Sequence, residues 1–207
     1  MYHAPVVSNV IQTTYDARAP LYNAIVRMLS FGGDAEYRRA AVDALDLKPG
    51  DRVLDIGCGT GLNFRDIANA VGPTGFVVGT DLSHGMLSQV ERRPNLRLVQ
   101  AAASQDVFKP GSFDAILSTY VISTILDEEI LGPLCKALKP GGRLVIADDT
   151  MPPGWFIGPR FMFGRMLKKG WPDLKGDTIR ALRPLFSDLR VTHRHFGMIY
   201  IISGRRK

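Results

Sequence analysis

Apolar positions along the chain follow two alternating spacings, which together predict strands and helices in turn. Short apolar runs, typical of strands buried in a parallel sheet, occur at 52–57, 75–81, 95–101, 112–119 and 143–149. Segments with apolar residues three or four positions apart separate several of them, at 62–70, at 84–93 and from Asp127 to Lys139, where Pro133 is expected to kink or delay the helix. This alternation predicts an α/β fold with a mostly parallel sheet and helices on both faces.

Both ends of the chain carry further expected elements. Residues 20–30 have helical spacing with Pro20 in the first turn, and Asp34 is expected to cap the helix that follows. Ser83 is expected to cap the helix at 84–93. A short helix near 177–186 and two strands around Gly197 would close the sheet antiparallel. We therefore expect one domain over 1–207, made of an N-terminal helical cap (1–47), a core (48–150), an aromatic and basic lid segment (151–176), and a C-terminal helix with strands (177–207).

Composition sets the broad class of protein. Apolar residues make up 45% and charged residues 22% of the chain, as in ordinary globular proteins. No apolar run approaches the ~18 residues of a membrane-spanning helix, and the first residues lack the pattern of a signal peptide. The two cysteines, Cys58 and Cys135, offer neither a disulfide framework nor a metal quartet. We expect a cytoplasmic protein with no metal site.

The net charge of +6 is unevenly distributed. Residues 1–150 contain 14 Lys and Arg against 17 Asp and Glu, whereas residues 151–207 contain 12 against three, an excess of nine positive charges. Such asymmetry favours an anionic partner, and the plainer interpretation is a solvated basic face. Residues 154–171, "GWFIGPRFMFGRMLKKGW", interleave large aromatic rings with basic residues. That mixture suits peripheral binding to an anionic (inner) membrane surface, or alternatively a lid buried on one face.

A glycine loop follows the first strand of the expected core. Gly57, Gly59 and Gly61 lie where a parallel strand turns into its helix, which is where open α/β sheets bind ligands. The spacing is G-x-G-x-G, and Leu62 stands where the dinucleotide fingerprint has its third glycine. No Lys-Ser/Thr pair ends the run, so the phosphate loop of nucleoside triphosphatases is also excluded.

Two carboxylates make the glycine loop more specific. Asp55 lies inside the first strand, where a buried carboxylate needs a cationic or hydrogen-bonding partner. Asp81 ends the second strand, the position from which a carboxylate binds the ribose hydroxyls of an adenosine. Together they predict a nucleoside ligand with a charged amino-acid end and no pyrophosphate, and S-adenosylmethionine fits that description.

Four segments resemble, in order, the motifs of class I S-adenosylmethionine-dependent methyltransferases: "VLDIGCGTG" (53–61), "VVGTDLS" (77–83), "GSFDAILSTYVIS" (111–123) and "ALKPGGRLVIAD" (137–148). The resemblance spans about 45–150 and implies a Rossmann-like fold with S-adenosylmethionine as the cofactor. By position it implies the following contacts: Asp55 near the cofactor's ammonium, the loop residues Gly57, Cys58, Gly59, Thr60 and Gly61 along its methionine moiety, Asp81 on the ribose, Leu82 and Met86 on the adenine, and Ser118 near the sulfonium.

The sequence departs from the family pattern at one point. The family commonly has an acid after the third strand, which contacts the adenine amino group, and here Ala102 occupies that position. The backbone of Ala103, or the side chain of Ser104 or Gln105, is expected to substitute.

The acceptor side is less defined. "YDARAPLYNAIVRMLSFGGDAEYRR" (15–39) resembles the N-terminal segment of methyltransferases of ubiquinone and menaquinone biosynthesis, and small bacterial phospholipid N-methyltransferases have a similar layout. We expect a small lipophilic acceptor, such as a phospholipid headgroup amine or a prenylated quinone precursor. Tyr15, Tyr22 and Tyr120 are candidates for orienting it, and packing of helices is the alternative for the first two. No catalytic residue is assigned, because methyl transfer depends mainly on alignment and exclusion of water.

Other functions stay open at this level. A soluble metabolite or a nucleic acid could be the methyl acceptor, although "STYV" at 118–121 is unlike the [ND]-P-P-[YF] tetrapeptide of adenine and amide methylation, and no RNA-binding module is recognisable. Nucleic acid is therefore not the favoured partner. A non-catalytic S-adenosylmethionine-binding protein would have the same loop. A nicotinamide-dependent oxidoreductase shares the architecture but needs the glycine spacing that is absent here.

Overall fold

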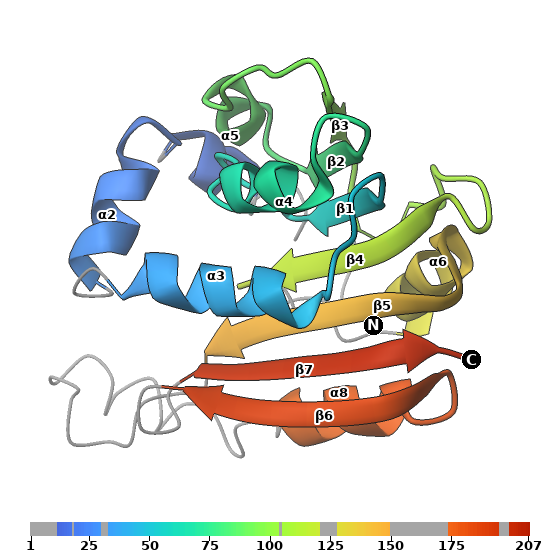
Figure 1. Cartoon of the computed structure of the whole chain (residues 1–207). Helices are drawn as coiled ribbons and strands as arrows, with labels where there is room; N and C mark the ends of the chain where they lie inside the picture. The colour runs from blue at the N-terminus through green and yellow to red at the C-terminus, as the bar shows by residue number, and fades with distance from the viewer. Residues whose placement is uncertain are drawn as a thin grey trace, which may run out of the picture.

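One seven-stranded sheet, in the order β3-β2-β1-β4-β5-β7-β6, forms the centre of the computed structural model (Figure 1). The strands are β1 (Arg52–Ile56), β2 (Phe76–Asp81), β3 (Leu96–Gln100), β4 (Phe113–Thr119), β5 (Leu138–Asp149), β6 (Phe186–Arg194) and β7 (Ile199–Arg206). Strand β7 runs antiparallel to both of its neighbours, and the pairs among β1 to β5 are parallel. The expectation of a mostly parallel sheet with an antiparallel C-terminal strand is confirmed.

The structure describes residues 12–17, 19–29, 33–103, 105–120, 128–149, 174–194 and 199–207. Ser104 and the segment 154–171 lie outside these residues, so two of the sequence predictions fall where nothing is described. Within the described residues, no helix has the length and apolar character needed to cross a membrane.

Helices cover both faces of the sheet. They are η1 (Ala19–Leu21), α2 (Tyr22–Leu29), α3 (Asp34–Ala44), α4 (Phe64–Val71), α5 (His84–Ser88), α6 (Glu128–Ala137) and α8 (Leu174–Leu182), and residues 12–17 are also helical. Helices α3 and α4 pack on one face, where Val42 and Ile67 join the cluster around Val53. Helices α6 and α8 pack on the other, where Leu134 and Leu182 join the cluster around Leu54. Two cores on opposite faces therefore define a three-layer fold.

Burial on both faces explains why the central strands are continuously apolar. Val53 and Leu54 are adjacent in β1, point to opposite faces, and are both fully buried. Full burial of a Val or Leu side chain contributes about 1.5–3 kcal/mol relative to exposure. The sheet is thus held by both helix layers, which leaves the strand ends as the place for polar chemistry.

The expected cap of α3 is wrong. Gly33 occupies the cap position without a side-chain hydrogen bond, and Asp34 is the first residue of the helix. Its carboxylate instead accepts a hydrogen bond from Nε of Arg38, 2.7 Å away and one turn later. The buried guanidinium binds the carboxylate that was expected to bind the helix backbone.

Several element boundaries also differ from the expected ones. Helix α6 contains Pro133 and begins before it, at Glu128, so the proline does not delay the start of the helix. Helix α5 ends at Ser88, before the expected end at residue 93, and α8 begins at Leu174, within the range expected for the lid segment. Strand β5 begins at Leu138, before the expected start at residue 143, and its pairing with β4 shifts between Leu138 and Arg143. Gly141, with φ of 74°, allows the backbone to make that shift.

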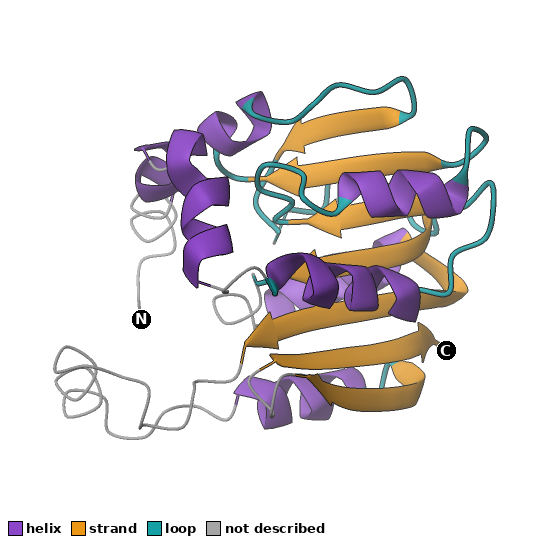
Figure 2. Cartoon of the chain, turned by 60° about the vertical axis from the view of Figure 1, so that its left-hand side comes forward, coloured by secondary structure: helices purple, strands orange, loops and turns teal. Residues whose placement is uncertain are grey.

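The carboxyl ends of β1, β2 and β4 meet at one edge of the sheet. Helix α2 stands beyond this edge, on the side to which the arrowheads of β4 and β5 point in Figure 1, and the turned view of Figure 2 brings it forward. The N-terminal helices therefore lie over the edge at which open α/β sheets bind ligands.

Candidate cofactor site

Backbone hydrogen bonds hold the loop after β1 in shape, and its glycines leave one side of it accessible. The Gly61 amide donates to the Cys58 carbonyl, and the Cys58 amide donates to the Thr80 carbonyl, each at 2.9 Å. Gly57, Gly59 and Gly61 have φ of 62°, 55° and 80°, the left-handed region that favours glycine. A Cβ placed on Gly59 would meet no atom within 4 Å, so this side of the loop is open to a ligand.

Replacing Gly61 with alanine tests the loop's conformation. The added Cβ would lie 2.5 Å from Cδ2 of Phe64 and 3.3 Å from Cγ1 of Val90, at a φ that alanine rarely adopts. We expect Gly61→Ala to lower stability by about 1–3 kcal/mol. Thermal denaturation followed by circular dichroism would then show a Tm lower by about 2–4 °C for each kcal/mol.

Gly132→Ala in α6 is the matched control for this substitution. A Cβ at Gly132 meets nothing within 4 Å, and alanine favours the helix, so Tm should stay the same or rise. Equal Tm values for Gly61→Ala and the unmodified chain would contradict the described loop.

The side chains of the loop point away from its open face. Cys58 is buried in the core on the α3 and α4 face, and burial raises the pKa of its thiol, which stays protonated. Thr60 is also buried, and its hydroxyl donates a 2.6 Å hydrogen bond to Oδ1 of Asn23 in α2. The side chains of Cys58 and Thr60 thus stabilise the loop and its contact with α2. A ligand on the open face of the loop would contact the backbone atoms of these two residues.

Asp81 joins the ends of β1 and β2. Its Oδ2 accepts from the Gly59 amide and its Oδ1 from the Ser83 amide, both at 2.8 Å. Burial raises the pKa of this carboxyl, while the backbone donors act in the opposite direction. Each oxygen keeps a lone pair for a further donor, so the carboxylate can accept from two vicinal hydroxyls. This geometry fits a ribose at the end of β2.

An unexpected residue holds the helix that follows Asp81. Ser83 caps α5, as expected, by accepting from the Met86 amide. Its hydroxyl also donates to Oδ1 of Asp16, 2.5 Å away, and the Gly85 amide donates to the same oxygen at 2.8 Å. These hydrogen bonds hold the pKa of Asp16 below its usual range. The helical segment 12–17 is thereby fixed to the start of α5.

Asp55 is fully buried at the end of β1. Its Oδ2 accepts from Nδ2 of Asn63 at 3.0 Å, whereas Oδ1 is buried with no hydrogen-bond partner among the described residues. Burial raises its pKa to about 7, since desolvation outweighs the hydrogen bond from Asn63. A buried acceptor without a partner is costly, and a ligand ammonium would supply the missing donor.

The structure reveals three further polar residues beside Asp55. Arg38, Asn63 and Thr119 are buried, and hydrogen bonds link them to Asp55 and to one another. The sequence contained one signal for them, because Asp34 and Arg38 stand four residues apart on a helix.

The expected adenine side is formed by the ends of β2 and β3. Leu82 is half-buried and its carbonyl accepts from Nε2 of Gln100, whereas Met86 is buried. The Ala102 amide donates to Oε1 of Gln105, so this glutamine oxygen is already engaged within the loop. Ala103 lines a small pocket with Ile56 and Thr80 on the α6 face. Adenine contacts at these residues stay predictions.

Ser118 and Thr119 point to opposite faces at the end of β4. Ser118 is paired with Ile56 and Ile146, whose side chains belong to the core on the α6 face. Its hydroxyl is buried with no hydrogen-bond partner among the described residues. Thr119 lies on the same face as Asp55 and was not among the site residues expected from the sequence. The contact of Ser118 with the sulfonium stays a prediction.

The three candidate tyrosines occupy two places. The rings of Tyr15 and Tyr22 meet edge to face, with centroids 6.2 Å apart. Burial raises the pKa of Tyr22, so its phenol keeps the proton and can donate a hydrogen bond. Tyr120 follows β4 with φ of 59°, and its ring lies under the guanidinium of Arg38. None of the three is shown to contact an acceptor.

Among the described residues, no three His, Cys, Asp or Glu side chains gather as a metal site would require.

Comparison with known proteins identifies the class. Residues 53–142 match the family model described as "Methyltransferase domain". Demethylmenaquinone methyltransferase of Thermus thermophilus is 36% identical over 157 residues, which cover 72% of this chain and 71% of that protein. The chain belongs to the class I S-adenosylmethionine-dependent methyltransferases, a family of enzymes whose cofactor is S-adenosylmethionine.

Within this class, quinone methyltransferases are among the proteins that this chain resembles in sequence. Demethylmenaquinone methyltransferase of Beutenbergia cavernae is 37% identical over 141 residues, or 67% of this chain and 58% of that protein. The chain therefore spans little more than half of such a relative. Among solved structures, phosphoethanolamine N-methyltransferase 2 of Haemonchus contortus, in complex with S-adenosylhomocysteine, has a TM-score of 0.63 at 27% identity, covering 78% of this chain and 39% of that one.

The residues at the strand ends fit this cofactor. The unpartnered Oδ1 of Asp55 suits the ammonium of the methionine moiety, the open side of Gly59 allows close approach to the backbone, and Asp81 suits the ribose hydroxyls. The ammonium and the ribose are chemically different parts of one molecule, and the open loop lies between the residues that suit them.

Proposed function

We propose that the chain transfers a methyl group from S-adenosylmethionine to a small lipophilic acceptor of the quinone class. The buried, unpartnered Asp55 Oδ1 beside the open glycine loop carries the cofactor half of the proposal. The acceptor half is supported by the names of relatives that are 36–37% identical.

The cofactor brings the activated methyl group, and the chain's own residues bind, orient and exclude water. Asp55 and Asp81 hold the two ends of the cofactor, so its position is fixed along the loop. The contacts of Asp16 with α5 and of Asn23 with Thr60 keep the N-terminal helices over the strand ends. Those helices, which include Tyr22, form the side from which an acceptor would enter.

Transfer of label from cofactor to lipid tests this proposal. The chain is incubated with S-adenosylmethionine labelled in its methyl group and a bacterial lipid extract, and the organic phase is separated by chromatography. We expect label in the quinone fraction, and less of it with the Asp81→Ala variant when the cofactor is below saturation. Label confined to protein or nucleic acid, or a chain that binds the cofactor but labels nothing, would contradict the proposal.

A water-soluble phosphorylated amine is the second candidate acceptor. The specific observation in its favour is the 27% identity, over 78% of this chain, to a protein named phosphoethanolamine N-methyltransferase 2. With phosphoethanolamine added to the incubation, label in this amine and not in quinones would decide for it. The phospholipid headgroup amine stays a prediction from the sequence.

Peripheral membrane binding through 154–171 is proposed on composition alone, since these residues lie outside the described ones. Co-sedimentation with anionic vesicles at low salt tests it, and no binding would contradict it.

The pKa of Asp55 predicts how cofactor affinity depends on pH. The carboxylate form binds an ammonium, and below its pKa of about 7 the proton must first be removed, so affinity for S-adenosylmethionine should fall as pH falls through about 7. The limiting slope is about tenfold per pH unit. Isothermal titration calorimetry between pH 5.5 and 8.5 measures it.

5′-Methylthioadenosine, which lacks the amino-acid part, is the control ligand for this titration. Its affinity should not follow the titration of Asp55. A flat profile for S-adenosylmethionine would contradict the placement of its ammonium at Asp55.

A further inference from the structure

A buried chain of hydrogen bonds connects α3 to Asp55. Nη1 of Arg38 donates to Oγ of Thr119 at 2.9 Å and to Oδ1 of Asn63 at 3.3 Å. Nδ2 of Asn63 in turn donates to Oδ2 of Asp55 and to Oγ of Thr119, both at 3.0 Å. Arg38 is only 7% exposed, and Asp34 neutralises it at 2.7 Å. The four elements α3, β1, β4 and the loop before α4 thus share one polar cluster.

Arg38 determines which way the Asn63 amide points. A guanidinium can only donate hydrogen bonds, so the amide atom facing Arg38 has to be the oxygen. The amide nitrogen is then directed to Asp55, where it satisfies Oδ2 and leaves Oδ1 as the one acceptor for a ligand. With an apolar residue at position 38, the amide could reverse, and its oxygen would then face the carboxylate.

Arg38 also contacts the acceptor side of the site. Its guanidinium carbon lies 5.1 Å from the ring centroid of Tyr120, a distance typical of cation–π contact. The Tyr120 amide donates to the Ala147 carbonyl at 2.8 Å, which anchors the left-handed residue that ends β4.

We propose that Arg38 is a positioning residue, which acts through Asn63 and Thr119 to present Oδ1 of Asp55 to the ammonium of the cofactor. The inference rests on the proposed cofactor function, since it assigns a task within that site. Neither the glycine motif nor the family model, which begins at residue 53, includes Arg38.

Electrostatics supports the same assignment. The charge of Arg38 lowers the pKa of Asp55, and Asp81 across the loop raises it. Four further titratable groups lie nearby among the described residues: Asp34, which pairs with Arg38, Tyr22, whose phenol interacts with the charges of Arg38 and Asp81, Tyr120, whose ring contacts Arg38, and the protonated thiol of Cys58. Loss of the guanidinium should therefore favour the protonated form of Asp55, which cannot pair with an ammonium.

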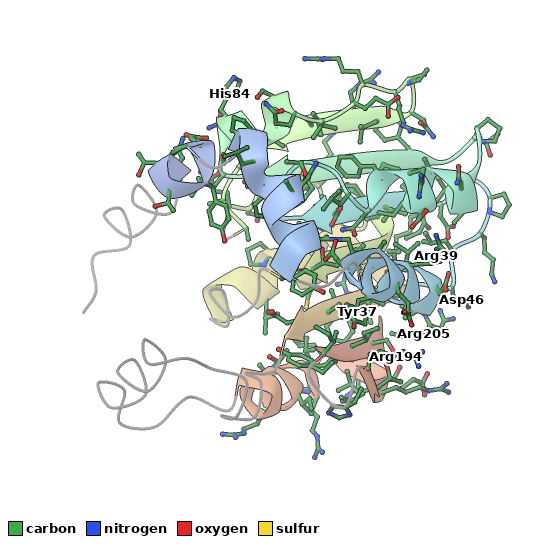
Figure 3. All side chains as sticks on the ribbon, turned by 90° about the vertical axis from the view of Figure 1, so that its left-hand side faces the viewer. Tyr37, Arg39, Asp46, His84, Arg194 and Arg205 are labelled. Carbon is green, nitrogen blue, oxygen red and sulfur yellow. The ribbon has the colours of Figure 1, made fainter. Side chains whose placement is uncertain are left out.

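The test compares Arg38→Met with Arg39→Met. Arg39, labelled in Figure 3, is the next residue of α3 and is exposed. Arg39→Met therefore makes the same chemical change as Arg38→Met but leaves the buried cluster intact. Calorimetry measures the affinity for S-adenosylmethionine and for 5′-methylthioadenosine at several pH values. We expect Arg38→Met to weaken the affinity for S-adenosylmethionine at pH 7 by about tenfold or more and to move the midpoint of its pH profile upward. The affinity for 5′-methylthioadenosine should change less than about threefold.

Different outcomes separate the possible failures. Equal weakening of both ligands without a moved midpoint would assign Arg38 a merely structural role and overturn the proposal, as would unchanged binding of both. Failure of the unmodified chain to bind S-adenosylmethionine would instead contradict the proposed function. The Arg39→Met variant should bind both ligands as the unmodified chain does.

Thr119→Val keeps the proposal testable should Arg38→Met not fold. Valine has nearly the shape of threonine but lacks the hydroxyl that joins Arg38 to Asn63. We expect a smaller loss of affinity, about threefold or more for S-adenosylmethionine and none for 5′-methylthioadenosine. Unchanged affinity for both ligands would overturn the link through Thr119.

Discussion

Asp81→Ala should weaken every ligand that contains the adenosine ribose. The substitution removes the acceptor of the Gly59 and Ser83 amides and of the ribose hydroxyls. Loss of charge-assisted hydrogen bonds of this kind costs about 1–3 kcal/mol, which corresponds to about 5- to 150-fold in the dissociation constant. Calorimetry should show this loss for S-adenosylmethionine, S-adenosylhomocysteine and 5′-methylthioadenosine alike.

A surface aspartate provides the control for Asp81. Asp106 is exposed and pairs only with Lys136 among the contacts described, so Asp106→Ala removes a carboxylate without touching the strand ends. Affinities equal to those of the unmodified chain are expected. Unchanged affinity in Asp81→Ala would show that the ribose lies elsewhere.

Asp55→Asn should separate the two ends of the ligand. Asparagine nearly preserves the shape of the side chain but cannot carry the negative charge that pairs with an ammonium. We expect S-adenosylmethionine and S-adenosylhomocysteine to bind about 10-fold to 150-fold more weakly, because hydrogen bonds to charged groups contribute about 1.5–3 kcal/mol. Affinity for 5′-methylthioadenosine should stay within about threefold, since this ligand has no ammonium.

Stability gives an independent readout for the same substitution. Asp55 has a raised pKa, so the neutral amide does not remove a favourable charge from the ligand-free protein, and Tm at pH 7.5 should not fall sharply. An equal loss for all three ligands would mean that the substitution disturbs the whole loop, and the assignment of the ammonium would then be wrong.

The sheet and the glycine loop were predictable because their signals are local. The apolar runs of β1 and β2 mark buried strands, and Gly57, Gly59 and Gly61 all adopt the left-handed backbone that their spacing suggested. Asp81 follows from its place at the end of a strand. Each of these inferences needs only a few neighbouring residues.

Arg38, Asn63 and Asp16 could not be predicted in the same way. The contacts of Arg38 with Asn63 and Thr119, and of Asp16 with α5, join residues 25 to 81 positions apart, and in the sequence these side chains look like ordinary polar surface residues. The phase of β4 was equally hidden. A strand buried on both faces is apolar at every position, so its pattern does not tell whether Ser118 or Thr119 shares a face with Asp55.

The edge strand β6 has a consequence for self-association. Among the described residues, strand β6 pairs with β7 alone and lies at the edge of the sheet, so its outer backbone groups could template pairing with a second chain. Its pairing with β7 is interrupted between Ser187 and Arg190, where Asp188 has a φ of 52°, and exposed Arg194 lies near its end. An irregular, charged edge makes a poor template for further strands, which protects the chain against aggregation along this side.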